Sequence, residues 1–464
     1  MGEMQDIAQV ARERLGFDRL RPGQEHAVRA VLDGRDTLVV MATGAGKSAI
    51  YQIAGWMIEG ATLVISPLIS LQRDQIGNIE VEQPGEAAAI DASVSEAKRE
   101  ERLEDLAAED LEFLFLAPEQ LAREETVGRL AEANVSLVVV DEAHCISEWG
   151  HDFRPDYMRI GPLVDRLGSP TVLALTATAS APVREEIVER LHMREPDVII
   201  RGFDRPNVWL EVDRHHDDGR KRRALVERAK AIGGPGIVYV ATRKGAEELA
   251  AELDDAGLRA LPYHAGLSKT DRDGAQAAFM GDELDVIAAT TAFGMGVDKP
   301  NVRFVLHSEP SDSVDSYFQE IGRAGRDGEP ADAVLFYRTE DLGMRRFFAG
   351  GGDSEERREW ERSRVEMMRA YAEHDHCRRA FVLSYFGEPA DACRNCDNCE
   401  AGRGPADEGD QPFEVGSSVV HAEWGEGAVQ RYDGDRVVVL FESVGYRTLS
   451  VELVTERGLL DAAS

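Results

Sequence analysis

The stretch TLVVMATGAGKS, residues 37–48, decides the fold, because a short apolar run here meets a glycine-rich loop that ends in lysine and serine. The apolar run predicts a buried strand that brings the loop to the edge of a sheet. The glycines let backbone N–H groups approach phosphate oxygens, while the lysine suits the β- and γ-phosphates and the serine hydroxyl suits Mg²⁺. The stretch therefore predicts a nucleotide site. Its expected contact residues are Thr43, Gly44, Ala45, Gly46, Lys47 and Ser48.

A second apolar run, LVVVDEAH at 137–144, ends in two consecutive carboxylates. Phosphoryl transfer needs such groups beside a phosphate loop, with Asp141 holding Mg²⁺ and Glu142 polarising the attacking water. Each pattern has an ordinary alternative. The first could be a chance loop, since Met41 stands where the strict motif has glycine, and the second could be a solvated turn. Their joint occurrence disfavours both alternatives.

The composition argues against several classes of protein. The chain carries 53 Lys and Arg against 86 Asp and Glu, a formal net charge of −33, which disfavours a protein that binds nucleic acid through bulk positive charge. No apolar run approaches the length of a membrane span, so we expect no membrane partner and a cytoplasmic location, nucleoid-associated if the source is bacterial. The 464 residues and their hydrophobic content of 43% support large cores in about three or four domains.

Near-continuous apolar runs recur in two series that are separated near residues 200–210. The first series lies at 37–41, 61–66, 111–117, 137–140 and 172–175, and the second at 236–240, 259–263, 285–290, 302–307 and 333–337. Such runs are typical of parallel strands covered by helices on both faces. The pattern then becomes helical and charged, passes into CRNCDNC at 393–399, and ends in short β-rich runs. We predict an α/β fold with parallel-sheet domains at 1–205 and 206–340, a helical platform with a metal module at 341–402, a flexible linker at 403–412, and a small SH3- or tudor-like β-barrel at 413–464.

Four of the five cysteines crowd into one short segment. Their spacing does not suggest a disulfide framework, but four thiolates suit a closed tetrahedral Zn²⁺ site. An iron–sulfur cluster is the alternative, because closely spaced cysteines also occur in ferredoxins. We expect His374 and His376 to be surface neighbours, and Cys145 to be a small buried residue. The predicted metal ligands are Cys377, Cys393, Cys396 and Cys399.

Eight segments occur in the order typical of superfamily 2 helicases. They are GFDRLRPGQ (16–24), ATGAGKS (42–48), SPLISLQRDQ (66–75), DEAHCISEWGHDFRPDY (141–157), LTATA (175–179), YHAGL (263–267), ATTAFGMGVDKPNVRFVLH (289–307) and YFQEIGRAGRDG (317–328). In detail, the chain resembles the RecQ family of DNA helicases over residues 10–400. HCISEWGHDFRP and AFGMGVDKPNVRF are highly specific to that family.

The resemblance implies two RecA-like domains that close on ATP. Gln24 would hydrogen-bond the adenine, with Phe17 stacked on the ring and Arg21 nearby; a core anchor is the alternative role for Phe17. His144, with Thr176 and Thr178 of LTATA, would link the nucleotide state to the position of the second domain, where Asp298 would lie on the facing loop. The residues expected to approach the γ-phosphate are Gln319, Arg323 and Arg326, with Arg326 as the arginine finger.

The resemblance also implies that the loop after Glu142 couples single-stranded DNA to hydrolysis. The loop is rich in aromatic and cationic side chains, which can stack on bases and contact phosphates. Burial in the core is the alternative for its tryptophan. The segment at 66–75 is expected to grip the DNA backbone without reading bases. The expected DNA-binding residues are Ser66, Pro67, Trp149, His151, Phe153 and Arg154.

The tail departs from the family pattern, because the residues after Cys399 are too few for the winged-helix and C-terminal helical domains of longer relatives. They resemble the tudor-like module of superfamily 1 repair helicases, and their partner is open. We predict a monomeric DNA-dependent ATPase and 3′–5′ DNA helicase of repair or recombination that uses ATP, Mg²⁺ and Zn²⁺ on single-stranded and partly duplex DNA. The alternatives are a translocase that does not separate strands, an RNA helicase, and a partner-recruiting DNA-binding protein that uses ATP structurally.

Overall fold

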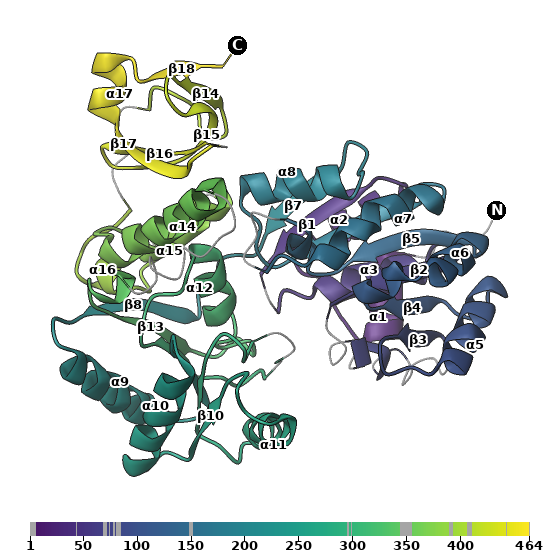
Figure 1. Cartoon of the computed structure of the whole chain (residues 1–464), viewed down its shortest axis with the longest axis horizontal. Helices are drawn as coiled ribbons and strands as arrows, with labels where there is room; N and C mark the ends of the chain where they lie inside the picture. Colours follow the sequence, from purple (N-terminus) through teal and green to yellow (C-terminus); the bar gives the residue numbers. More distant parts are fainter. Residues whose placement is uncertain are drawn as a thin grey trace. The chain divides into compact units, whose positions relative to one another are not determined.

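The computed structural model describes residues 6–42, 44–67, 72–73, 75–77, 79, 85–147, 152–294, 297, 299–343, 355–388, 393–405, 411–441 and 443–463. The chain divides into two compact units, Met1–Phe203 and Asp204–Ser464 (Figure 1). Each unit contains one parallel sheet, so the predicted α/β class is confirmed. Among the described helices, none is both long and apolar enough to cross a bilayer.

The first unit is built on a seven-stranded sheet with the order β3-β4-β2-β5-β6-β1-β7, in which the strand pairings are parallel. All residues of β1 are buried, as its unbroken apolar sequence predicts. The strands are β1 (Thr37–Met41), β2 (Ala61–Ile65), β3 (Ala87–Ile90), β4 (Phe113–Leu116), β5 (Val135–Val140), β6 (Thr171–Thr176) and β7 (Asp197–Arg201). The helices are α1 (Ile7–Leu15), α2 (Gln24–Leu32), α3 (Lys47–Gly55), α5 (Glu96–Ala107), α6 (Glu124–Glu132), α7 (Ile160–Arg166) and α8 (Ala181–Arg190), with short 3₁₀ helices η1 (Pro118–Ala122), η2 (Ala143–Ile146) and η3 (Pro155–Arg159).

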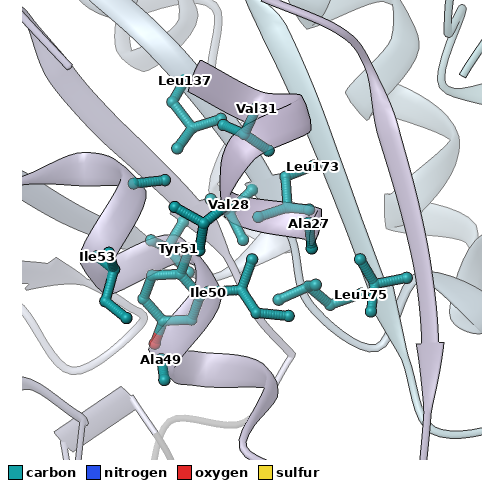
Figure 2. Packing of buried hydrophobic residues seen from close by; sticks show 14 of the residues in the cluster. Ala27, Val28, Val31, Ala49, Ile50, Tyr51, Ile53, Leu137, Leu173 and Leu175 are labelled. Atoms are coloured by element: carbon teal, nitrogen blue, oxygen red, sulfur yellow. The ribbon is translucent and has the colours of Figure 1, made fainter. Parts of the chain in front are cut away.

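Helix α3, which follows the glycine-rich loop, is buried along most of its length. A helix that is apolar on all sides is stable only inside a core, and the sequence AIYQIAG gives α3 this character. Figure 2 shows its Ile50 and Tyr51 in one cluster with Val28 of α2 and with Leu173 and Leu175 of β6. Full burial of one such side chain stabilises the fold by roughly 1.5–3 kcal/mol. The packing therefore fixes the start of α3 relative to the sheet.

The second unit begins with a six-stranded sheet of the order β10-β11-β9-β12-β13-β8, again with parallel pairings. The helices that connect its strands follow the same α/β pattern, and α12 carries part of the predicted arginine motif. The strands are β8 (Val208–Arg214), β9 (Gly236–Tyr239), β10 (Ala260–Tyr263), β11 (Val286–Ala289), β12 (Phe304–His307) and β13 (Ala331–Tyr337). The helices are α9 (Asp218–Ile232), α10 (Arg243–Asp255), α11 (Lys269–Met280) and α12 (Val314–Ile321).

A helical platform and a small sheet complete the second unit. The platform consists of α14 (Glu355–Glu373), α15 (Arg378–Phe386) and α16 (Asp397–Glu400). The five-stranded antiparallel sheet, here called the C-terminal sheet, has the order β17-β16-β15-β14-β18 and a core of valines and Phe441. Its elements are β14 (Ser418–His421), β15 (Gly425–Asp433), β16 (Arg436–Phe441), β17 (Gly445–Ser450), α17 (Val451–Arg457) and β18 (Leu460–Ala462). The expected short strands are present, and the tudor-like likeness stays a prediction.

One expectation about the platform is wrong. His374 is not a surface neighbour of the cysteines but is buried, with its ring 5.0 Å from the ring of Phe381. Its Nδ1 lies 3.4 Å from Asp433 Oδ2 of β15. The reason is that the C-terminal sheet packs over this part of the platform. The residues next to His374 in the sequence do not indicate this packing. Residues 406–410 of the predicted linker lie outside the described residues.

Candidate functional site

The glycine-rich loop is held by a side chain from the preceding helix. Gln24, the first residue of α2, donates from Nε2 to the carbonyl oxygens of Gly46 (2.8 Å) and Ala45 (3.3 Å). Gly44 and Gly46 have φ of 79° and 80°, a left-handed conformation that favours glycine. Lys47, at the start of α3, donates from Nζ to Met41 O (3.0 Å). The loop therefore precedes a helix N-terminus, where N–H groups and the helix dipole favour a bound phosphate.

The expected adenine-binding residues lie next to this loop. Arg21 contacts the loop directly, since its guanidinium donates to Gly44 O, and its backbone N–H donates to Gln24 Oε1 (2.7 Å). Phe17 is 42% exposed, so its alternative role as a core anchor is wrong. Gln24 is buried, and its side-chain amide donates to a carbonyl oxygen of the loop. Sequence reasoning missed this loop-holding role, and the contact of Gln24 with adenine stays a prediction. Thr43 lies outside the described residues.

The paired carboxylates follow β5, at the same end of the sheet as the loop after β1. Asp141 accepts hydrogen bonds from Ser66 Oγ (3.2 Å) and from the backbone N–H of Glu142 (3.0 Å). Burial and the neighbouring Glu142 raise the pKa of Asp141 to about 7, although Lys47 opposes the shift. A divalent cation would favour its ionised form, because an opposite charge lowers the pKa of a carboxyl group. Burial and the charge of Asp141 raise the pKa of Tyr51, and a hydrogen bond with Ser48 opposes this shift, so both predicted Mg²⁺ ligands act on one side chain. The donors are hard oxygens and fit Mg²⁺.

Glu142 and His144 connect this strand end to the next one. Glu142 has φ 48° and ψ 46°, a left-handed conformation that costs a non-glycine residue about 1–3 kcal/mol. Its Oε2 lies 3.4 Å from His144 Nδ1, which is also 2.9 Å from Thr176 Oγ1 at the end of β6. Thr176 Oγ1 in turn donates to Thr178 O (3.0 Å). Glu142, His144, Thr176 and Thr178 therefore form a continuous set of contacts within the first unit, and their coupling to the second domain stays a prediction.

Arg154 brings two of the expected DNA-binding segments together. Its Nη1 donates to Pro67 O (3.4 Å), and its Nε donates to Asp152 Oδ2 (3.1 Å). Cys145 is buried, as expected, and its Sγ lies 3.6 Å from the same Asp152 oxygen. Sequence reasoning missed Asp152, which holds the arginine at the base of the loop. Trp149 and His151 lie outside the described residues, and Phe153 is half-buried.

The arginine motif of the second unit lies on α12 and the turn that follows it. Gln319 is on the helix, and Arg323 and Arg326 flank a turn in which Gly325 has φ 56°. Arg326 donates from Nη1 to Val297 O (3.1 Å), and Arg323 is buried. Arg205 was missed from the sequence: it donates to the carbonyl oxygens of residues 322, 324 and 325 and so holds the turn. Asp298 lies outside the described residues.

Four cysteines form a metal-binding cluster on the platform. The Sγ atoms of Cys377, Cys393, Cys396 and Cys399 lie within 4.8 Å of one another. The Cys377–Cys393 distance is 3.4 Å and the Cys393–Cys399 distance is 3.9 Å. A tetrahedral Zn²⁺ site with Zn–S bonds of about 2.3 Å requires sulfur separations of about 3.8 Å. A cubane iron–sulfur cluster would hold its thiolates farther apart, because each one binds a different iron. The spacing therefore favours zinc over the iron–sulfur alternative.

Backbone N–H groups support the same ligands. Ala380 N donates to Cys377 Sγ (3.5 Å), Asn395 N to Cys393 Sγ (3.4 Å) and Cys399 N to Cys396 Sγ (3.4 Å). Such outer contacts orient metal ligands and stabilise the thiolate form. Hydrogen bonds from the neighbouring cysteines lower the pKa of Cys377. The donor set and its surroundings therefore fit Zn²⁺.

Three family models match this chain in succession. The model of the DEAD/DEAH box helicase matches residues 21–187, and that of the helicase conserved C-terminal domain matches residues 220–328. The model of RecQ zinc-binding matches residues 339–400, which include the four cysteines.

Curated relatives and solved structures agree with these matches. The chain is 41% identical over 387 residues to the ATP-dependent DNA helicase RecQ of Bacillus subtilis, covering 83% of this chain and 65% of that protein. It is 40% identical over 340 residues to the probable ATP-dependent DNA helicase RecS of the same organism, covering 73% of this chain and 68% of that protein. A structure of the Mycobacterium smegmatis helicase Lhr bound to ssDNA and AMP-PNP is similar in fold, with a TM-score of 0.56 and 22% identity, over 75% of this chain and 50% of that one. The chain thus spans less than two thirds of the length of the first of these relatives.

Proposed function

Because the chain belongs to the RecQ family of superfamily 2 helicases, we propose that it is an ATP-dependent DNA helicase. It binds single-stranded and partly duplex DNA, hydrolyses ATP when DNA is bound, and uses the hydrolysis to move 3′ to 5′ and to separate strands. A monomeric state, a role in repair or recombination and a cytoplasmic or nucleoid location belong to the same proposal.

One observation carries this proposal: a phosphate-binding loop and a carboxylate pair meet at one end of the first sheet. Lys47 follows β1, Asp141 and Glu142 follow β5, and the charge of Lys47 acts on the Asp141 carboxyl group. Binding sites in parallel α/β sheets lie at the carboxyl ends of the strands, where these residues are. The arrangement supports ATP hydrolysis more directly than ATP binding alone, because it contains a candidate base as well as phosphate contacts.

Each residue has a proposed task in hydrolysis. Lys47 and the N–H groups of the loop bind the β- and γ-phosphates, and Phe17 supports the adenine. Mg²⁺ held by Ser48 and Asp141 would neutralise the charge of the phosphates. Glu142 orients and polarises the attacking water, and His144 holds the Glu142 carboxylate through its contact at 3.4 Å. Gln319, Arg323 and Arg326 are proposed to stabilise the charge of the transferred phosphoryl group.

The first experiment measures ATP hydrolysis by the full chain with no nucleic acid, with single-stranded DNA and with single-stranded RNA. We expect strong stimulation by DNA and weak stimulation by RNA. The Lys47→Ala variant should hydrolyse no ATP under any condition while retaining the fold of the wild type by circular dichroism. Stimulation by RNA alone would favour an RNA helicase, and the absence of hydrolysis with measurable ATP binding would favour a protein that uses ATP structurally.

The second experiment separates a helicase from a translocase. A duplex with a 3′ single-stranded tail is incubated with the protein and ATP, and release of the displaced strand is measured. The proposal predicts strand release on the 3′-tailed substrate and little on a 5′-tailed one. DNA-stimulated hydrolysis without strand release would instead support a translocase.

A further inference from the structure

Helix α15 of the platform contacts the first turn of α12, the helix that carries Gln319 and precedes the turn with Arg323 and Arg326. Tyr385 of α15 donates from its hydroxyl to Asp315 Oδ2 (2.6 Å), and both residues are buried. Asp315 belongs to the first turn of α12, which is capped by Ser313. A hydrogen bond to a charged acceptor in a buried place is stronger than a neutral surface one, and it is costly to break. Tyr385 therefore fixes the beginning of α12.

The same helix α15 also fixes the turn after α12. Arg379 donates from Nη1 to Arg205 O (2.6 Å) and from Nη2 to Val208 O (2.6 Å), and it is buried. Arg205 donates from Nη2 to Ala324 O and Gly325 O, both at 2.8 Å. The turn that carries Arg323 and Arg326 is thus held by an arginine whose own backbone is held by α15. The helix braces the arginine motif at both of its ends.

The C-terminal sheet contacts the same helix α15 through a tyrosine of β17. Tyr446 of β17 donates from its hydroxyl to Tyr385 Oη (3.2 Å), and their ring centroids are 5.7 Å apart. Tyr446 is 4% exposed, and the ring of Trp360 of α14 packs against it at 5.7 Å. Burial and the nearby Asp315 raise the pKa of Tyr385 well above its usual value, so its hydroxyl stays protonated and donates to Asp315. The donors and acceptors run in one direction, from Tyr446 through Tyr385 to Asp315.

We propose that the C-terminal sheet is a positioning element for ATP hydrolysis, which acts through the Tyr446–Tyr385–Asp315 hydrogen bonds on the helix and turn that present Gln319, Arg323 and Arg326. This inference rests on the proposed function, since it needs the arginine motif to act in hydrolysis. Tyr446 and Tyr385 are positioning residues, because their hydrogen bonds act on Gln319 and the arginines through Asp315 of α12. The role differs from that of a tethered recruiting module, which would not need a buried hydrogen bond to the helix that holds α12.

The test compares Tyr446→Phe with wild type and with Tyr432→Phe. Tyr432 is a matched control in the same sheet: its hydroxyl donates to Phe413 O (2.9 Å), a carbonyl group of the C-terminal segment and not of the platform or α12. Tyr446→Phe should lower the kcat of DNA-stimulated ATP hydrolysis about 2- to 10-fold, the range that one buried hydrogen bond supports, with the KM for ATP unchanged. Tyr432→Phe should keep the wild-type kcat. The double variant Tyr446→Phe/Tyr385→Phe should lose less than the product of the two single effects, as coupled residues do.

Hydrogen–deuterium exchange of residues 314–321 tests whether the C-terminal sheet stabilises α12, and it does not depend on ATP hydrolysis. Tyr446→Phe should speed exchange of these amides, and Tyr432→Phe should not. Unchanged exchange would overturn the inference. Faster exchange with unchanged kcat would also overturn it, because the sheet would then stabilise α12 without positioning the arginines. If the wild type hydrolyses no ATP, the proposed function fails on its own experiment, whereas the exchange measurement still reports whether the sheet braces α12.

Discussion

Glu142 is the residue whose geometry is most specific to its proposed task. It adopts a left-handed backbone conformation, with φ 48°, and its carboxylate faces the buried His144. Local strain of this kind persists where the surroundings fix a side chain in one direction. We predict that Glu142→Gln lowers the kcat of ATP hydrolysis by about 10²- to 10⁴-fold, the usual contribution of a positioned base. Steady-state ATPase assays measure kcat, and titration with a fluorescent ATP analogue should show binding close to that of the wild type.

The control for this variant is Glu189→Gln, which removes an exposed carboxylate from the same unit. It should retain wild-type hydrolysis. If Glu142→Gln also retained more than a tenth of the wild-type kcat, Glu142 would not be the base.

At the residue scale, the sequence predicted the grouping of the four cysteines but not what each polar side chain contacts. The glycine-rich loop, the paired carboxylates and the four cysteines each have a characteristic spacing in the sequence, because the groups that bind one phosphate or one metal ion must lie close together. The contacts by which Gln24 holds the loop and Arg205 holds the turn have no such fixed spacing. The amide and guanidinium groups of these two residues donate hydrogen bonds to backbone carbonyl oxygens that are far away in sequence. The residues next to a polar side chain in the sequence do not reveal such a distant partner. His374 was misplaced for a related reason, since its cover comes from a different element.

At the element scale, the cysteine cluster holds the start of α15, the helix that contacts α12 and the backbone of Arg205. Cys377 caps α15 by accepting from Ala380 N, and α15 carries both Tyr385 and Arg379. A structural zinc site contributes directly to folding free energy. We predict that Cys396→Ser reduces bound zinc from about one ion per chain to well below one and lowers the melting temperature. Atomic absorption measures the metal, and differential scanning fluorimetry measures the melting temperature.

Cys145→Ala is the matched control, because Cys145 is also buried but lies in the first unit. This variant should keep the zinc stoichiometry. Normal zinc content and melting temperature in Cys396→Ser would refute a structural role for the metal.

The contact between β17 and α14 can be tested with two glycines. Gly445 has φ +70°, and a Cβ there would overlap Ser363 Oγ of α14, whereas Gly434 has φ +59° with open space around it. Both alanine variants bear the cost of the left-handed backbone, about 1 kcal/mol or more. Only Gly445→Ala must also separate the C-terminal sheet from α14. We therefore expect it to lower the free energy of unfolding more than Gly434→Ala does, as measured by urea denaturation. Equal losses would show that this contact contributes little to stability.

The parallel strands at the centres of both sheets were predictable from their unbroken apolar runs. The missed strands are β3, β7 and β8. The sequence of β3 is AAAI, and alanine has little strand preference. β7 and β8 lie at sheet edges. The sequence of β7, DVIIR, has only three consecutive apolar residues, and that of β8, VWLEVDR, is interrupted by charged residues, so neither contains a long continuous apolar run. The cover of the platform by the C-terminal sheet was also unpredictable, because nothing in the local sequence of either element specifies its partner.

At the scale of the whole molecule, the excess of acidic residues sets the response to salt. The formal net charge of −33 gives a repulsion that opposes the compact state. Screening acts over about 10 Å at 0.1 M salt and about 3 Å at 1 M, so added salt weakens this long-range repulsion. It also weakens surface ion pairs, but these contribute only about 0–1 kcal/mol each. The net effect of moderate salt on the free protein should therefore be stabilising.

We predict that raising NaCl from low concentration to about 0.5 M increases the melting temperature of the free chain and reduces its affinity for single-stranded DNA. The two effects have opposite signs because salt screens repulsion within the protein but competes with its cations for phosphates. Scanning fluorimetry and fluorescence anisotropy measure them in the same buffers. Sucrose at matched osmolality is the control, since it does not screen charge and should leave the DNA affinity nearly unchanged. A melting temperature that falls steadily with NaCl would mean that the ion pairs, and not the net charge, dominate the electrostatics of this fold.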